Sequence, residues 1–194
     1  MIEDCTAIIL AGGNSQRMGR DKADLPLGEK TLLQTVTATM QQLFPQVIVS
    51  VRQPRATVDL PQICDEQPDG GPLAGLAASL GQATTPWIFA VACDMPFVVP
   101  GVVEQLAKHR AQHQAVVPIV QGHPQPLAAF YAASCLAVMQ ANLALQQKSL
   151  KNVLRQLDVC YVGEAEMLEA DPQLRSFFDL DTPQDMAAAL NGVK

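Results

Sequence analysis

Apolar residues follow two different periodicities along the chain, and the two alternate. Short, nearly continuous apolar runs occupy residues 6–10, 46–51, 87–92 and 115–120. Strands buried on both faces have this pattern, and the strands of a parallel sheet are buried in that way when helices cover both sides. The four runs therefore predict strands of a mostly parallel sheet.

The segments between these runs have apolar residues at helical spacing. Thr31 and Gln34 form a capping-box pattern ahead of one such segment, which predicts a helix from residue 32. Four more helices are predicted from start and end signals: one from Pro72 to Gly81, one around Val102 and Leu106, one capped by Ser149, and a final helix from Thr182-Pro183 to Leu190. Alternating strands and helices imply a three-layer α/β domain.

Residues 115–131 depart from this alternation, because two short strands are joined there by residues 121–126 alone. A connection of that length suits antiparallel neighbours, so we expect a small antiparallel insertion in the sheet. The sequence contains no internal repeat, low-complexity tract or long linker. We therefore expect a single domain over residues 1–194.

Composition narrows the class of function. Lys and Arg number 13 against 19 Asp and Glu, and the formal net charge of -6 argues against a nucleic-acid partner, which requires a basic surface. Local cations and backbone N–H groups still suffice to bind a small anion. No apolar run approaches the roughly 18–20 residues of a membrane span. The five cysteines are scattered, which is typical of reduced thiols, and no signal-peptide pattern is present, so we expect a cytoplasmic protein with no membrane partner.

The loop after the first strand, residues 10–22, carries the densest candidate chemistry. Ligands of open parallel sheets bind at the carboxyl ends of the strands, where this loop begins. Gly12 and Gly13 have no Cβ, so backbone N–H groups there can approach phosphate oxygens. Arg17 can bind two oxygens at once, and Lys22 supplies a compact positive charge. The loop matches neither the dinucleotide fingerprint nor the P-loop, and its residues alone leave a plain charged turn as the alternative.

The order L-A-G-G-x-S-x-R-M-G-x-D-K at residues 10–22 resembles the nucleotide-binding loop of the molybdenum cofactor guanylyltransferases. The resemblance implies a three-layer Rossmann-like nucleotidyltransferase fold, which the cytidylyltransferases of the molybdenum cofactor and of isoprenoid synthesis share. Those relatives usually have Ala-Ala-Gly where this chain has Ala11-Gly12-Gly13, and Asp21-Lys22 also favours the guanylyl branch. The residues implied to bind GTP in this segment are Leu10, Ala11, Gly12, Gly13 and Lys22.

Three further segments extend the resemblance over most of the chain. Asp65 stands where the family has a nucleotide-contacting carboxylate, and Gly71–Gly75 resembles a segment along the base, which implies a GTP contact at Gly75. Asp94 follows seven apolar residues, at the predicted tip of a strand, and matches the GTP-binding and metal-binding Asp of the family. Mg²⁺ prefers such hard oxygen ligands. Without the resemblance, Asp65 is equally a surface acid, residues 71–75 a turn before a helix, and Asp94 a cap.

Asp179 and Asp181 are the clear departure from the family, which commonly has Asn at both positions facing the pterin or the metal. In this chain the two aspartates either supply a second metal oxygen or favour the positive end of the final helix. His123 lies in the insertion loop, in a stretch that also resembles the family. We do not include it in the predicted site, because a single loop histidine is more often merely exposed.

The resemblance implies transfer of GMP from GTP to the terminal phosphate of molybdopterin, with release of pyrophosphate. That phosphate is already an anionic nucleophile, so alignment and charge stabilisation suffice for the reaction. Arg17, Lys22 and Asp94 are then the catalytic residues, with Mg²⁺ held by Asp94 as the cofactor. Proteins that handle the molybdenum cofactor would be transient partners. The alternatives are a cytidylyl- or sugar-phosphate nucleotidyltransferase and a non-catalytic nucleotide or pterin carrier.

Overall fold

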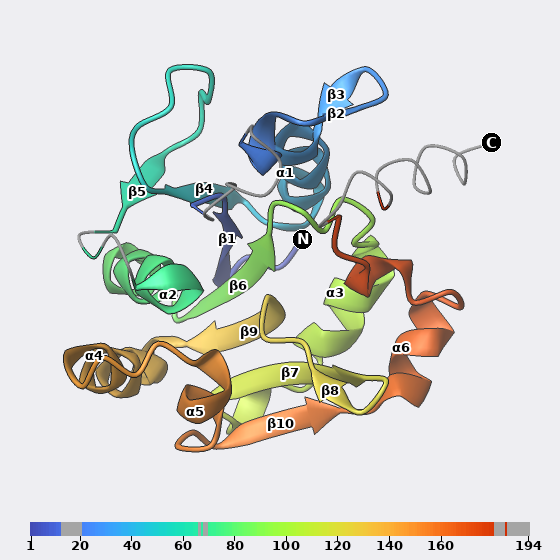
Figure 1. The fold of residues 1–194 in the computed structure, drawn as a ribbon. Coiled ribbons are helices and arrows are strands. Elements are labelled where there is room, and N and C mark those ends of the chain that lie inside the picture. Colours follow the sequence, from blue (N-terminus) through green and yellow to red (C-terminus); the bar gives the residue numbers. More distant parts are fainter. Residues whose placement is uncertain (13–20, 66, 68–69, 181–184, 186–194) are drawn as a thin grey trace.

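One twisted sheet runs through the molecule (Figure 1). The computed structural model describes residues 1–12, 21–65, 67, 70–180 and 185. The strands of this sheet are β1 (Cys5–Leu10), β4 (Gln46–Val51), β5 (Gln62–Cys64), β6 (Trp87–Ala92), β7 (Ala115–Val120), β8 (His123–Pro124), β9 (Ala128–Ala132) and β10 (Val159–Val162). Their order is β10-β7-β9-β6-β1-β4-β5, and β8 pairs with β7. A separate hairpin consists of β2 (Pro26–Leu27) and β3 (Lys30–Thr31).

The sheet is parallel apart from the segment for which the sequence predicts antiparallel pairing. β1 pairs in parallel with β4 and β6, β4 with β5, and β7 with β10. β9 runs antiparallel to both of its neighbours, β6 and β7. The antiparallel segment is therefore more central than an appended hairpin, because β9 lies between two strands of the main sheet.

Helices cover both faces of the sheet. They are α1 (Leu32–Leu43), α2 (Gly71–Gln82), α3 (Pro100–Ala107), α4 (Leu136–Ala144), α5 (Leu150–Leu154) and α6 (Glu164–Ala170). Buried residues of α1, α3 and α6 share one core cluster with the sheet, and those of α2, α4 and α5 share the other. The predicted three-layer α/β fold is thus confirmed.

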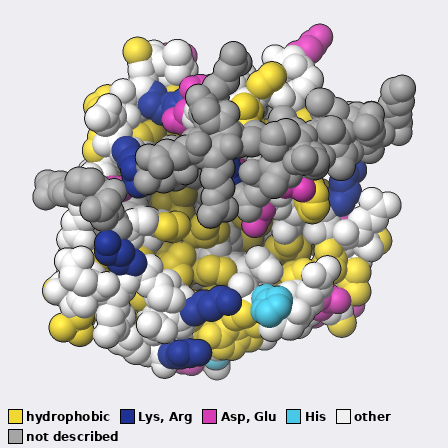
Figure 2. Space-filling model, in the orientation of Figure 1, with side chains coloured by type: hydrophobic (Ala, Val, Ile, Leu, Met, Phe, Trp, Pro, Cys, Tyr) yellow, Lys and Arg dark blue, Asp and Glu magenta, His cyan; other side chains and the backbone are white. Residues whose placement is uncertain are grey.

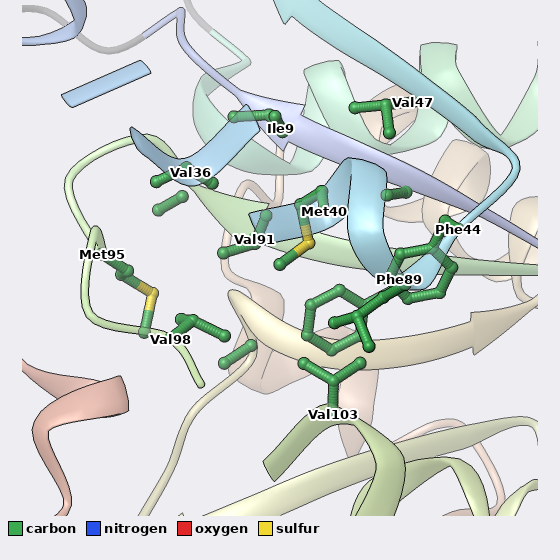
Figure 3. Close-up of a cluster of buried hydrophobic side chains, with 14 of the residues drawn as sticks. Ile9, Val36, Met40, Phe44, Val47, Phe89, Val91, Met95, Val98 and Val103 are labelled. Atoms are coloured by element: carbon green, nitrogen blue, oxygen red, sulfur yellow. The ribbon is translucent and has the colours of Figure 1, made fainter. Parts of the chain in front are cut away.

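Neighbouring residues of one strand explain why its apolar run is continuous. Ile8 packs on the side of α2 and α4, and Ile9 packs on the side of α1 and α3. Both are fully buried. On the α1 side, the rings of Phe44 and Phe89 stack with centroids 5.6 Å apart (Figure 3), and the ring of Phe130 in β9 lies 4.8 Å from Phe89. These aromatic contacts tie the antiparallel strand to the parallel part of the sheet.

The predicted strands at 46–51, 87–92 and 115–120 are confirmed, and the first strand begins one residue early, at Cys5. The capping box is present: the Thr31 hydroxyl accepts a hydrogen bond from the Gln34 N–H at 3.2 Å, and the Gln34 side chain accepts one from the Thr31 N–H at 2.9 Å. Ser149 precedes α5, but its side chain makes no capping hydrogen bond. Its carbonyl instead accepts from two amides of the short helix, which closes the turn through the backbone.

α4, β10 and α6 have no counterpart among the predicted elements, and neither do the short strands β2, β3, β5 and β8. α4 consists largely of small and apolar residues around its circumference, and β10 has only four residues, so neither shows a distinct periodicity. The predicted final helix begins outside the described residues. In the part of the chain that the structure describes, no helix is long and apolar enough to cross a membrane.

Candidate functional site

A cavity of about 450 Å³ lies at the carboxyl ends of β1, β4 and β6. This is where ligands bind in open α/β sheets. Figure 2 shows the hollow on this face, with hydrophobic side chains visible inside it. Its lining residues come from the strand ends, the start of α2, the loop before β9 and the segment before residue 180: Leu10, Ala11, Gly12, Asp21, Lys22, Ser50, Arg52, Asp65, Gly71, Pro72, Gly75, Ala92, Cys93, Asp94, Met95, Gln125, Pro126, Leu127 and Asp179.

The structure brings most of the residues predicted to form a site to this one cavity. They are Leu10, Ala11, Gly12, Lys22, Asp65, Gly75 and Asp94. Gly13 and Arg17 lie outside the described residues, as does Asp181. Asp179 lines the cavity. His123 is exposed on β8 and does not line it.

Sequence reasoning missed several lining residues. Ser50 and Arg52 lie at the end of β4, so the rule that placed the first loop at a strand end would also have found them. Gln125, Pro126 and Leu127 lie between β8 and β9, in the insertion stretch that resembles the family but is not included in the predicted site. They reach the cavity because β9 lies next to β6.

An ion pair joins two distant parts of the chain inside the cavity. The Lys22 Nζ lies 3.0 Å from the Asp94 Oδ2, and both side chains are about one-fifth exposed. Asp94 follows β6, where the Cys93 N–H donates to the Leu10 carbonyl at 3.1 Å and so fixes the turn beside β1. A cation and a carboxylate are thus held together on the wall of the cavity.

Lys22 begins a short 3-10 helix, η2 (Lys22–Asp24), that presents its side chain to Asp94. Asp21 caps this turn, because its side chain accepts a hydrogen bond from the Ala23 N–H at 3.0 Å. Ala23 is fully buried, which anchors the turn in the core. The chain therefore places Lys22 through a capped and buried turn.

Two glycines of the cavity wall differ in how closely the neighbouring residues pack against them. A Cβ on Gly75 would lie 2.6 Å from the Ser50 Oγ and 3.1 Å from the Leu10 Cδ2, so the absence of a side chain lets α2 approach β1 and β4. A Cβ on Gly12 would meet the Arg52 side chain at 3.4 Å, an ordinary contact distance. A side chain at position 75 would therefore force its neighbours to move, whereas packing within the described chain leaves room for one at position 12.

Cys93 lines the cavity next to Asp94 but is not a nucleophile. Its side chain is buried, and burial, together with the negative charge of Asp94, raises the pKa of its thiol to about 12. The group is thus a neutral thiol at physiological pH, and thiolates are the reactive form of cysteine.

The segment before residue 180 closes the cavity beside Asp94. The Leu180 N–H donates to the Asp94 carbonyl at 2.9 Å, and the Leu180 side chain is fully buried against Leu32. Its neighbour Asp179 lines the cavity. This anchoring explains why the aspartate, so distant along the chain, belongs to the same wall as Asp94.

Carboxylates determine which metal the cavity suits. Within the described residues, no group of three or more His, Cys, Asp or Glu is arranged to hold a metal ion. Four carboxylates line the wall, those of Asp21, Asp65, Asp94 and Asp179. Asp21 is bound by Ala23 and Arg55, and Asp94 pairs with Lys22. Mg²⁺ is commonly held by one or two carboxylates together with substrate phosphates, so this donor set fits Mg²⁺.

Comparisons with known proteins agree on one family. The MobA-like NTP transferase domain matches residues 7–160. A protein of Chloroflexus aggregans, named as a probable molybdenum cofactor guanylyltransferase, is 35% identical over 93% of this chain and 91% of its own. A protein of Syntrophotalea carbinolica, named molybdenum cofactor guanylyltransferase, is 30% identical over 93% of this chain and 88% of its own.

Solved structures give the same picture. Molybdopterin-guanine dinucleotide biosynthesis protein A of Archaeoglobus fulgidus superposes with a TM-score of 0.87 at 26% identity, over 97% of this chain and 98% of that one. The 2-C-methyl-D-erythritol 4-phosphate cytidylyltransferase of Thermus thermophilus superposes with a TM-score of 0.71 at 16% identity, over 96% and 97%. The second likeness shows the shared fold alone.

Proposed function

The chain belongs to the MobA-like NTP transferase family, and from that premise we propose that it transfers GMP from GTP to the terminal phosphate of molybdopterin, releasing pyrophosphate. The names of its relatives and of the Archaeoglobus fulgidus structure support this substrate pair. The observation that carries the proposal is the ion pair of Lys22 and Asp94 at the strand ends, in a cavity with glycines on its wall. That arrangement supplies charge and backbone donors for a nucleoside triphosphate.

In this proposal the nucleotide lies along the wall made by β1, β4 and the start of α2. The absence of side chains at Gly12 and Gly75 lets the ligand approach the backbone closely. Lys22 neutralises phosphate charge, and Asp65 at the same wall accepts hydrogen bonds from the nucleoside. Arg17 and Gly13, which the resemblance assigns to the same loop, complete the proposed phosphate contacts.

The chemistry needs alignment more than acid–base groups. An oxygen of the acceptor phosphate forms a bond to the α-phosphorus of GTP while the bond to the bridging oxygen breaks, and pyrophosphate leaves with that electron pair. The nucleophile is already an anion, so no side chain has to remove a proton from it. Lys22 stabilises charge that builds up on the phosphates, as is usual in phosphoryl transfer.

Asp94, with Asp179 on the same wall, would hold Mg²⁺ as the cofactor. When bound, the ion neutralises phosphate oxygens and so favours attack on phosphorus. Within the chain Asp94 has the Lys22 ammonium as its counter-ion. The same carboxylate is thus matched to positive charge with or without a metal.

Pyrophosphate release tests the proposal. The purified protein is mixed with molybdopterin and either GTP or CTP, with and without Mg²⁺. We expect release with GTP and Mg²⁺ only. Equal release with CTP would favour a cytidylyltransferase, and GTP binding by calorimetry without any release would favour a carrier.

A further inference from the structure

Arg55 lies in the loop after β4 and binds both ends of the turn that carries Lys22. Its guanidinium forms ion pairs with Asp21, which caps η2, and with Asp24, the last residue of η2. The Arg55 side chain is only 14% exposed, and it is not part of the cavity wall. It therefore contacts the Lys22 turn without lining the cavity itself.

The loop that carries Arg55 is itself fixed to the sheet. The side-chain amide of Gln62, the first residue of β5, accepts a hydrogen bond from the Arg55 N–H at 2.8 Å. The same amide donates to the carbonyls of Arg55 at 2.9 Å and Val58 at 3.1 Å. The guanidinium thus projects from a rigid backbone, and its position is set by the central sheet.

Charge explains why the turn needs this contact. Lys22 is flanked by two carboxylates, on Asp21 and Asp24, either of which can compete with Asp94 for its ammonium group. Arginine presents several donors in a fixed planar fork, so one guanidinium can engage both carboxylates. Burial lowers the pKa of Arg55, but its hydrogen bonds to Asp24 and Asp21 outweigh that effect and raise it, so the group stays charged.

Burial of the Arg55 side chain is unfavourable for stability. Its Nε is buried and makes no hydrogen bond within the described residues. A buried guanidinium with an unsatisfied donor contributes poorly to stability. The contact is better explained by where it holds Lys22.

We propose that Arg55 is a positioning residue, which occupies the carboxylates of Asp21 and Asp24 and so keeps Lys22 directed at Asp94 and at the phosphates of the bound nucleotide. The role of Lys22 on those phosphates rests on the proposed function. The position of the turn itself rests only on the contacts described.

A double-mutant cycle separates positioning from plain stabilisation. We expect Arg55→Gln to lower kcat/KM for GTP-dependent pyrophosphate release by about 10²-fold, as small displacements of catalytic groups do. Arg55→Lys keeps the charge but loses the planar fork, so its activity should lie between those of the wild type and Arg55→Gln. In a Lys22→Ala background, Arg55→Gln should have little further effect, because it acts through Lys22. Additive losses would overturn the proposal.

Arg110 provides the matched control. Its side chain is 16% exposed and pairs with Asp4 at 2.9 Å, so it resembles Arg55 in burial and in having an acidic partner, but it does not line the cavity. Arg110→Gln should leave kcat/KM within about twofold of the wild type, as expected of a change with no contact to the site. An equal loss in both variants would contradict a specific role for Arg55.

A second measurement does not depend on activity. The amides of Asp24 and Leu25 donate to Asp21 and Lys22 within the turn, so their hydrogen exchange reports its order. Arg55→Gln should speed exchange there and leave β1 unchanged. If the variant fails to fold, Asp24→Asn, at a side chain 59% exposed, should show the same change to a smaller degree. Unchanged exchange in the variant would overturn the inference about Arg55. A wild-type protein that releases no pyrophosphate would refute only the proposed function, and the exchange measurement would still test the inference.

Discussion

Two neighbouring parts of the cavity wall differ in their chemistry. The charged part has glycines and the ion pair of Lys22 and Asp94, at the ends of parallel strands. The neutral part consists of Gln125, Pro126 and Leu127, from the loop that enters the antiparallel strand β9, and it adjoins the charged part because the Ala92 N–H donates to the Leu127 carbonyl at 3.2 Å. Charges and backbone donors suit polyphosphate, whereas a neutral wall selects by shape.

The two parts are also held in place differently. The charged part depends on ionic contacts between distant segments, including the pairing of Arg55 with Asp21 and Asp24 beside Lys22. The neutral part depends on neutral hydrogen bonds: the Tyr131 hydroxyl donates to the Pro126 carbonyl at 2.7 Å, and the Gln125 N–H donates to the Pro118 carbonyl at 2.9 Å. If the charged part binds the nucleotide and the neutral part the acceptor, variants in each part should affect one substrate.

Asp94→Asn should have the largest effect. The amide keeps the size of the side chain but removes the charge that matches Lys22 and, in the proposed reaction, Mg²⁺. Loss of one preorganised electrostatic group of this kind costs about 10²–10³-fold in kcat. Pyrophosphate release measures the loss, and circular dichroism checks the fold. Asp158→Asn is the control, since that exposed carboxylate pairs with His113 away from the cavity. Turnover near the wild-type rate in Asp94→Asn would remove Asp94 from the mechanism.

Lys22→Ala should follow, with a loss of about 10²-fold in kcat/KM for GTP, because a phosphate counter-charge disappears. Lys151→Ala is the control, at an exposed position on α5 that does not line the cavity. Steady-state kinetics with varied GTP gives both values. If the two lysine variants lost activity equally, Lys22 would have no special place in the site.

Gly75→Ala tests the close approach of α2 to the strands. The new methyl group would meet the Ser50 hydroxyl and a Leu10 methyl below ordinary contact distance, so either these side chains or α2 has to shift. We expect the free energy of unfolding to fall by about 1–3 kcal/mol and the KM for GTP to rise several-fold. Urea denaturation and kinetics measure the two effects.

Two further variants sharpen this test. Gly81 lies on the same helix, and the methyl group of Gly81→Ala would meet the Leu136 side chain at 3.7 Å, an ordinary van der Waals distance. That change should raise the free energy of unfolding by about 0.5–1 kcal/mol. Combining Gly75→Ala with Ser50→Ala removes the closest contact and should recover part of the lost stability. If the Gly75→Ala protein were as stable as the Gly81→Ala protein, the contacts between α2 and the strands would adjust to the methyl group at no cost in stability.

The difference in chemistry between the charged and neutral parts of the wall also explains how much of the site could be predicted from the sequence. Binding a polyphosphate through the backbone demands glycine, lysine and aspartate at fixed places, so Gly12, Lys22 and Asp94 stand out in the sequence itself. A neutral wall accepts many side chains, so Gln125 and Leu127 are indicated only by the resemblance of their stretch to the family and not by the chemistry of their side chains. The sequence does not indicate Arg55 either, because its partners Asp21 and Asp24 are distant along the chain.

Prediction of the fold from the sequence is limited in a similar way. The strands of the parallel core are buried on both faces by helices, and this gives continuous apolar runs that predict their bounds closely. The insertion of β9 between β6 and β7 is a long-range pairing, which local pattern does not encode. Prediction is therefore strongest where burial alone determines the pattern.

Tyr131→Phe should have the smallest effect and sharpens the comparison most. The change removes only the hydroxyl that donates to Pro126, and the carbonyl left behind costs about 1–3 kcal/mol of unfolding free energy. If the neutral part of the wall, which includes Pro126, binds the acceptor, the KM for molybdopterin should rise a few-fold while the KM for GTP stays unchanged. Tyr161→Phe is the control, since the other tyrosine of the chain is 47% exposed. If Tyr131→Phe altered both KM values equally, the charged and neutral parts of the wall would not be separate binding surfaces, and the hydroxyl would stabilise the sheet as a whole.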